Sequence, residues 1–170
     1  MSQDRSIAQA RAGFDKPGSD KTADERRDFV SVTVADQLFG IPVLQVQDVL
    51  GPQRITRIPL APPEVAGSLN LRGRIVTAID LRVRLGLPAQ SGGAPKMSVV
   101  VDHGDELYSV LVDSVGEVLN LQTSAVERNP TTLDPVWRDV SAGIYRLNGK
   151  LLVILDVARV FDFSRRADAA

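Results

Sequence analysis

The chain has 170 residues, a net charge of −1 and an isoelectric point near 5.8, which argues against a nucleic-acid domain and against binding to an anionic membrane surface. It contains no cysteine, so disulfides, thiolate metal sites and cysteine nucleophiles are excluded. The first residues lack the apolar core of a signal peptide, and the longest strongly apolar run, 151–155, is too short to span a bilayer. We therefore expect a cytoplasmic protein that does not insert into a membrane.

Residues 1–27 form a polar segment that we expect to be a disordered tail. It carries charges of both signs, and its only sizeable apolar groups, Ile7 and Phe14, are too few to offset the entropy of ordering it. A short docking motif between Ile7 and Phe14 is the alternative. A second, C-terminal tail is expected at 164–170.

From Phe29 onward, strand-like runs rich in Val, Leu and Ile alternate with turn signals. Arg72-Gly73 and Asn148-Gly149 predict tight hairpin turns, because glycine readily takes the positive φ that such turns require. In chain order, the expected elements are strands at 29–34, 38–43, 46–50, 54–58, 65–71 and 74–79, a helix at 81–85, a linker at 88–95, strands at 97–101, 107–112 and 115–121, an irregular excursion at 130–137, strands at 143–147 and 150–155, and a helix from 156 to about 161.

The two halves of the sequence resemble each other. A shift of 76 positions (147 minus 71) aligns 71–85 with 147–161 and superposes a leucine, a glycine and an aspartate on identical residues. A shift of 69 positions (107 minus 38) aligns 38–50 with 107–119. The difference between the two shifts predicts a seven-residue insertion in the second copy, where 130–139 lies.

Two copies of about five strands and one short helix predict an all-β fold of two tandem β-barrels, since a barrel removes the exposed edges of a sheet. We expect one folded region at 28–163, with a first subdomain at about 28–90 and a second at about 95–163. Each copy is too small to bury much of its surface alone, so the copies are expected to pack together and leave a groove for a partner.

Residues that could carry chemistry are few. Asp80 and Asp156 invite comparison with paired catalytic carboxylates, but each directly opens a helix, and an N-cap is the better explanation. His103 is the only histidine, and it lies in a turn without the further ligands that a metal site needs. No nucleophile elbow and no phosphate-binding glycine motif is present, so enzyme activity is not expected.

The segment 70–74 (Asn-Leu-Arg-Gly-Arg) is a candidate for protein recognition. Arg72 would project from a rigid hairpin tip, where its five donors suit contact with another protein, although a turn arginine is usually just solvated.

The segment 43–50 also has two interpretations. Val43, Val46 and Val49 have the spacing of a helical turn that faces the core, or they form an apolar binding patch beside Asp48.

Four blocks of sequence form a specific array: Phe39-Gly40-Ile41-Pro42, Val46-Gln47-Asp48-Val49, Gly67-Ser68-Leu69-Asn70-Leu71-Arg72-Gly73 and Ile79-Asp80-Leu81-Arg82. Taken together, they closely resemble the CheW family of bacterial chemotaxis adaptors, and the second copy continues the likeness through 112–119, Gly143 and 152–157. The resemblance covers about 29–163. The combination of Asn-Leu-Arg-Gly with a downstream Asp-Leu-Arg is its most specific part.

The resemblance implies two SH3-like five-stranded barrels without catalysis, cofactor or metal. It implies two partners, the cytoplasmic tip of a chemoreceptor (a methyl-accepting chemotaxis protein) and the regulatory domain of the histidine kinase CheA, with recruitment to membrane receptor arrays. The partner-binding positions implied in this chain are Val46, Asp48, Val49, Gly67, Asn70, Arg72 and Gly73. Asp48 departs from the family, which often has glutamate there, and this shortens the reach of the carboxylate.

Two other functions remain open at this stage. One is an adaptor of a receptor array that controls something other than swimming. The other is an SH3-like barrel that binds RNA, which a basic cluster supports. The acidic isoelectric point and the scarcity of aromatic residues for stacking argue against RNA binding. The basic cluster consists of Arg72, Arg74, Arg82 and Arg84.

Overall fold

The computed structural model describes residues 25–88 and 95–163. The predicted tail at 1–27, including its docking motif, lies outside the described residues apart from its last three positions. The predicted C-terminal tail and most of the predicted linker also lie outside them. The first strand begins at Arg26 rather than at Phe29, because Arg26, Arg27 and Asp28 pair with residues 120–122 of a later strand.

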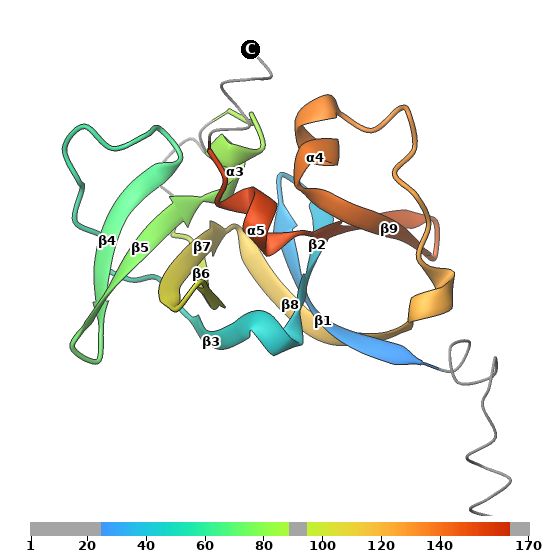
Figure 1. The fold of residues 1–170 in the computed structure, drawn as a ribbon, viewed down its shortest axis with the longest axis horizontal. Coiled ribbons are helices and arrows are strands. Elements are labelled where there is room, and N and C mark those ends of the chain that lie inside the picture. Colours follow the sequence, from blue (N-terminus) through green and yellow to red (C-terminus); the bar gives the residue numbers. More distant parts are fainter. Residues whose placement is uncertain (1–24, 89–94, 164–170) are drawn as a thin grey trace, which may run out of the picture.

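The described residues form two five-stranded sheets with short helices between the strands (Figure 1). This architecture confirms the predicted all-β class with two SH3-like barrels. In spatial order, barrel A consists of β8 (Ser114–Gln122), β1 (Arg26–Val34), β2 (Gln37–Pro42), β10 (Lys150–Leu155) and β9 (Ser141–Leu147). Barrel B consists of β3 (Val46–Leu50), β6 (Met97–His103), β7 (Glu106–Val112), β5 (Arg74–Asp80) and β4 (Val65–Leu71). The helical elements are η1 (Val43–Gln45), α3 (Leu81–Arg84), η3 (Thr123–Ala125), α4 (Pro135–Val140) and α5 (Val157–Val160).

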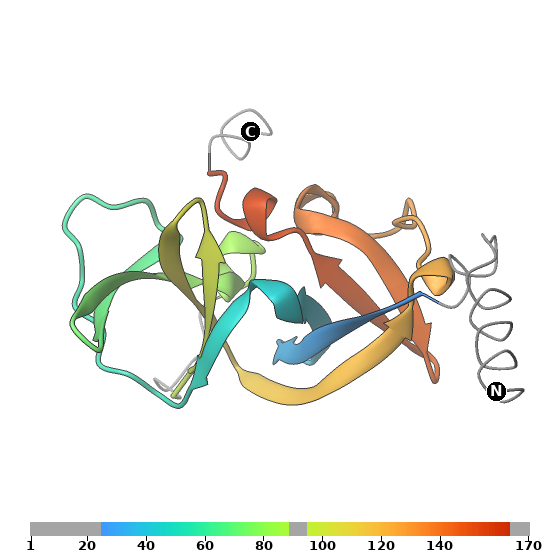
Figure 2. The same ribbon diagram turned by 60° about the horizontal axis from the view of Figure 1, so that its bottom comes forward.

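The strands are divided between the barrels differently from the predicted split at 90–95. The hairpin β1–β2 from the first half of the chain lies between β8 and β10 of the second half, and the hairpin β6–β7 lies between β3 and β5. Each barrel therefore takes two strands from one copy and three from the other. The barrels are interleaved rather than tandem, as the crossing of colours in Figure 2 shows.

The internal repeat explains why this exchange is possible. Under the two sequence shifts, the strand order of barrel A becomes that of barrel B, position by position. The registers agree as well. In barrel A, Phe39 pairs with Val153 in parallel, and the equivalent residues of barrel B, Tyr108 and Thr77, pair in the same way. A hairpin from either copy thus fits the same place in either barrel, which is the geometry of a swapped element within one chain.

The predicted strand at 54–58 is wrong. Residues 51–64 form a loop, in which Thr56 makes an isolated bridge to Ser68 with two backbone hydrogen bonds of 2.8 Å. Four prolines interrupt this stretch, and a proline cannot donate to a strand ladder. The irregular excursion predicted at 130–137 leads into the short helix α4, which begins at Pro135 and ends at Val140.

The predicted turns and caps are present. Arg72 and Gly73 have φ values of 53° and 85°, and Asn148 and Gly149 have 46° and 81°, so both hairpins use the left-handed region that two-residue turns need. The Asp80 carboxylate accepts a hydrogen bond from the backbone N–H of Arg82 at 3.0 Å, which is the N-cap contact of α3. The Asp156 carboxylate caps α5 in the same way.

The main apolar core is shared by both barrels. It combines residues of β1 and β2, such as Phe39 and Ile41, with residues of β6 and β7, such as Val99 and Val110, all of them almost fully buried. Leu81 from α3 belongs to it too. Each barrel also has a smaller core of its own, around Phe29 in barrel A and around Leu69 in barrel B. The barrels therefore pack against each other, as their small size requires.

Asp113, the residue between β7 and β8, connects the two barrels. Its carboxylate accepts two hydrogen bonds from Arg82, at 3.1 Å and 2.8 Å, and one from the Ala35 backbone N–H at 2.9 Å. The hydrogen bond from Arg82 is the main reason why the pKa of Asp113 lies below its ordinary value of 3.8.

The lowered pKa of Asp113 predicts that the free energy of unfolding depends on pH in the acidic range. Its contribution is complete above the unfolded-state pKa, which is the ordinary value of 3.8, and is lost as the pH falls through the lower folded-state pKa. Asp113→Asn should therefore reduce the free energy of unfolding at pH 7, and the difference from the parent should shrink below about pH 4. Denaturant unfolding at several pH values measures this, and a difference that is constant down to pH 2 would contradict it.

Candidate functional site

The candidate site lies on barrel B, where the tip of the β4–β5 hairpin approaches β3. These strands are far apart in the spatial order of the sheet, yet the guanidinium of Arg72 reaches the carboxylate of Asp48 at 3.4 Å. The Arg72 side chain is 81% exposed and that of Asp48 29%. An exposed pair of this kind contributes little stability, so Arg72 is available to a partner at small energetic cost.

Both interpretations of the segment 43–50 hold in part. Val43 and Val46 are half-buried and pack against the shared core, as expected of a core-facing turn. Val49 instead points outward and is 39% exposed. Leu44, which the sequence did not single out, is 92% exposed on η1, beside β1 of barrel A. Its position between two core-facing valines, on the outer side of a turn, is the signal that could have identified it.

Asn70 and Gly73 stabilise the hairpin tip and do not themselves supply the group that would contact a partner. The Asn70 side-chain oxygen accepts a hydrogen bond of 2.8 Å from the Gly73 backbone N–H. This contact holds the turn that carries Arg72. Both residues therefore belong to the site through the position that they give to Arg72.

Gly67 is buried under the loop 51–64 and offers no surface of its own. Its φ is 151°, and a Cβ atom at this position would lie 2.1 Å from the backbone oxygen of Thr56. Only glycine lets this loop bridge to β4. The equivalent residue of barrel A, Gly143, has a φ of 144° beside Glu127, so both barrels use glycine at the same close approach.

The basic cluster that supported RNA binding is split by the structure. Arg72 and Arg74 are exposed at the hairpin tip, whereas the Arg82 side chain is 14% exposed and that of Arg84 only 1%. The last two lie at the other end of β5, on α3, where they bind acceptors of the protein itself. No continuous basic face is formed from these four residues, which removes the main argument for RNA.

The loop 51–64 adds exposed apolar groups next to the hairpin. Ile58 is 41% exposed, and Leu60 is fully exposed with a φ of 63°. The loop and the start of β4 surround a shallow cavity of about 350 Å³. This cavity belongs to barrel B alone, so the groove expected between the barrels stays a prediction.

The described residues show no group of three or more potential metal ligands. His103 packs against the Phe161 ring at 5.7 Å between centroids, as part of an aromatic contact that includes Tyr108. Within the ranges 25–88 and 95–163, none of the helices has the length and apolar character needed to cross a membrane.

Comparisons with known proteins agree with this architecture. The family model of the CheW-like domain matches residues 28–165. Chemotaxis protein CheW of Helicobacter pylori is 29% identical over 132 residues, covering 78% of this chain and 79% of that protein. The protein of the same name from Klebsiella aerogenes is 28% identical over 141 residues, 83% and 85% of the two chains. The Bacillus subtilis protein of that name is 30% identical over 127 residues, 73% and 80%.

A solved structure has the same fold. The scaffolding protein TtCheW from Thermoanaerobacter tengcongensis superposes with a TM-score of 0.72 at 27% identity, covering 81% of this chain and 94% of that one. The family match spans nearly all of the described residues, and it includes the hairpin tip and β3. The chain therefore belongs to the CheW family of chemotaxis proteins.

Proposed function

We propose that this protein is a non-catalytic adaptor that couples chemoreceptor signalling tips to the regulatory domain of the histidine kinase CheA. The observation that carries the proposal is Arg72, an exposed guanidinium on a rigid hairpin in a chain of the CheW family. An arginine held by a rigid backbone is frequently a hot spot of protein–protein interfaces, a residue that contributes much of the binding free energy. The protein acts in the cytoplasm, at membrane receptor arrays.

The seven proposed site residues divide into two groups by their surroundings. Arg72, Asp48 and Val49 offer a charge of each sign and an apolar surface to the receptor. The remaining four hold these three in place from the core, the turn or the loop contact: Val46, Gly67, Asn70 and Gly73. Leu44 extends the apolar part toward barrel A.

Replacing Arg72 with glutamate tests the receptor-binding role. Arg72→Glu is expected to weaken binding to a receptor signalling fragment at least about ten-fold, because it removes a central arginine and places two carboxylates together. The melting temperature should change little, since an exposed charge usually affects stability by no more than about 0.5 kcal/mol. Titration calorimetry and thermal unfolding measure the two quantities.

Arg74→Glu is the matched control, because Arg74 is exposed on the same hairpin and makes the same charge change. We expect it to keep most of the affinity. Equal losses for both variants would show a non-specific charge effect. A large fall in melting temperature for Arg72→Glu would point to a structural residue instead.

The behaviour that the array controls is a separate part of the proposal. We propose chemotaxis, because the similar proteins are named as chemotaxis proteins. Deletion of the gene should then reduce spreading in soft agar. Normal spreading together with altered surface motility or biofilm would favour a non-swimming array.

A further inference from the structure

The two barrels meet at a point of approximate two-fold symmetry between α3 and α5. Under the shift of 76 positions, Arg84 of α3 is equivalent to Val160 of α5 (160 minus 84). These two residues contact each other, since the Arg84 Nε donates a hydrogen bond to the Val160 carbonyl at 2.8 Å. A residue that touches its own equivalent lies beside the symmetry axis, as in a two-fold dimer. Arg84 therefore lies at the centre of the junction.

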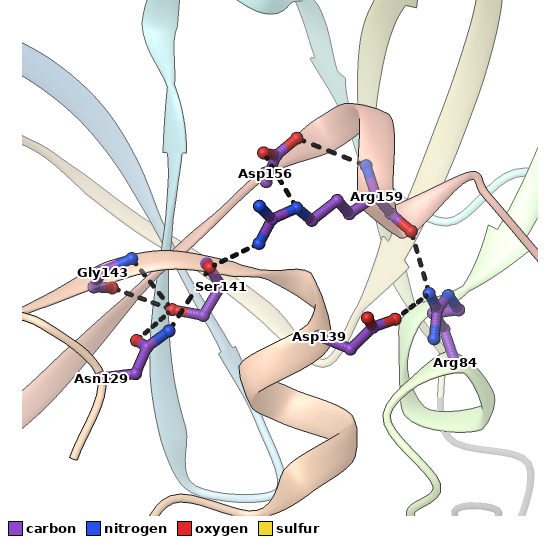
Figure 3. A network of polar contacts seen from close by, with 7 residues as sticks. All are labelled: Arg84, Asn129, Asp139, Ser141, Gly143, Asp156 and Arg159. Carbon is purple, nitrogen blue, oxygen red and sulfur yellow. Dashed lines mark hydrogen bonds and ion pairs between the residues drawn. The ribbon is translucent and has the colours of Figure 1, made fainter. Parts of the chain in front are cut away.

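The Arg84 guanidinium is buried and binds groups of α4 and α5, the helices that precede β9 and follow β10 of barrel A. Besides the Val160 carbonyl, it donates to the Arg159 carbonyl at 2.9 Å and faces the Asp139 carboxylate at 3.5 Å (Figure 3). Its side chain is 1% exposed. The two carbonyls belong to the last turn of α5, and the Arg159 carbonyl also accepts a hydrogen bond from the Asp162 backbone N–H at 3.2 Å. A planar guanidinium presents its donors in a fixed fork, whereas the three donors of lysine lie on one rotatable ammonium group.

The acceptors of Arg84 are themselves held by a polar network of barrel A. Arg159 is bound to Asp156 at 3.6 Å, and its guanidinium reaches the Ser141 carbonyl at 3.4 Å (Figure 3). Ser141 in turn binds Asn129 at 2.7 Å. Arg84 thus inserts into a site that barrel A keeps fixed through several strands and loops.

Two further contacts connect α3 and the residue after it with other elements. Arg82, two residues before Arg84 on α3, binds Asp113, and the Trp137 indole of α4 donates to the Leu85 carbonyl at 3.1 Å. The candidate site on β3 lies on the opposite side of the molecule, below α3 and α5 in the view of Figure 1. There, Val43 and Val46 join the shared core through apolar contacts, which are not directional.

We propose that Arg84 is a positioning residue that fixes the angle between the two barrels. The apolar core holds the barrels together, and the directional hydrogen bonds of Arg84 select one orientation among those that the core tolerates. A partner surface that spans both barrels then meets a preformed shape. The assignment does not depend on which partner the protein binds.

The distance between one spin label on each barrel tests this. The chain has no cysteine, so Ile75→Cys in β5 and Ala142→Cys in β9 provide the labelling sites, both exposed and both in strands. We expect one narrow distance distribution in the labelled parent protein. Arg84→Met should broaden it and displace its mean, while the amides of both sheets keep their protection from hydrogen exchange.

Arg146→Met is the control, because Arg146 makes its ion pair with Glu127 within barrel A and is 61% exposed. It should leave the distribution narrow. An Arg84→Met distribution with the width and mean of the parent overturns the proposal. If Arg84→Met does not fold, Arg84→Lys decides, since it keeps the cation and loses the planar fork. Broadening in Arg84→Lys supports the proposal, and an unchanged distribution overturns it.

Discussion

Cutting the chain between Gly92 and Gly93 is expected to give two halves that do not fold alone but fold together. Each barrel needs a hairpin from the other half, and the shared core combines strands of both. The isolated first half keeps β3, β4 and β5 without the central strands between them, and the isolated hairpin β1–β2 is too small to be stable. Equimolar mixing should restore the circular dichroism and the cooperative unfolding of the intact chain.

This result separates the interleaved fold from a tandem one. Tandem barrels would let each half unfold cooperatively by itself, with mixing adding nothing. A cut chain purified as one piece and then denatured and refolded provides the control, because it has the same ends as the mixed halves. Cooperative unfolding of either half alone would contradict the strand exchange.

Gly67→Ala is expected to be the most damaging small substitution. The added Cβ would lie 2.1 Å from the Thr56 backbone oxygen, and a φ of 151° is strained for any side chain. Backbone atoms cannot move aside as a flexible side chain can, so the free energy of unfolding should fall by about 3 kcal/mol or more. The loop 51–64 should lose its bridge to β4, and receptor binding should weaken with it.

Two other glycines calibrate this effect. Gly51→Ala meets no atom within 4 Å and should change stability by less than about 0.5 kcal/mol. Gly143→Ala should fall between the two, because its nearest neighbour is the Val126 side chain, at 2.9 Å. Denaturant unfolding gives all three values. A Gly67→Ala protein as stable as Gly51→Ala would contradict the close approach seen at Thr56.

The local structure was largely predictable, because strands, turns and caps depend on neighbouring residues. Asp80 and Gly73 take the conformations that their residue types favour. The exchange of hairpins was not predictable in this way. A hairpin from either copy presents a similar pattern and register, so the repeat cannot tell which barrel receives it. The short connections determine which barrel receives each hairpin, because only η1 lies between β2 and β3 and only Asp113 lies between β7 and β8.

The sequence indicates the segments of the candidate site, and the structure brings Arg72 and Asp48 together there, while their binding role stays a prediction. Arg72 and Val49 are exposed as a binding surface requires. Gly67 has a buried steric role that depends on a loop far along the strand, which no local pattern reveals. The sequence places Arg84 in one basic cluster with Arg72, Arg74 and Arg82, because it does not show that α3 faces the end of α5.

We propose that one molecule of this protein binds a receptor tip and the kinase regulatory domain at the same time. The direct test is co-sedimentation. Vesicles that carry a receptor signalling fragment are pelleted in the presence of the kinase regulatory domain, with and without this protein. The regulatory domain should enter the pellet only when this protein is present, and Arg72→Glu should reduce its amount there. A regulatory domain that stays in the supernatant with intact protein would contradict the claim.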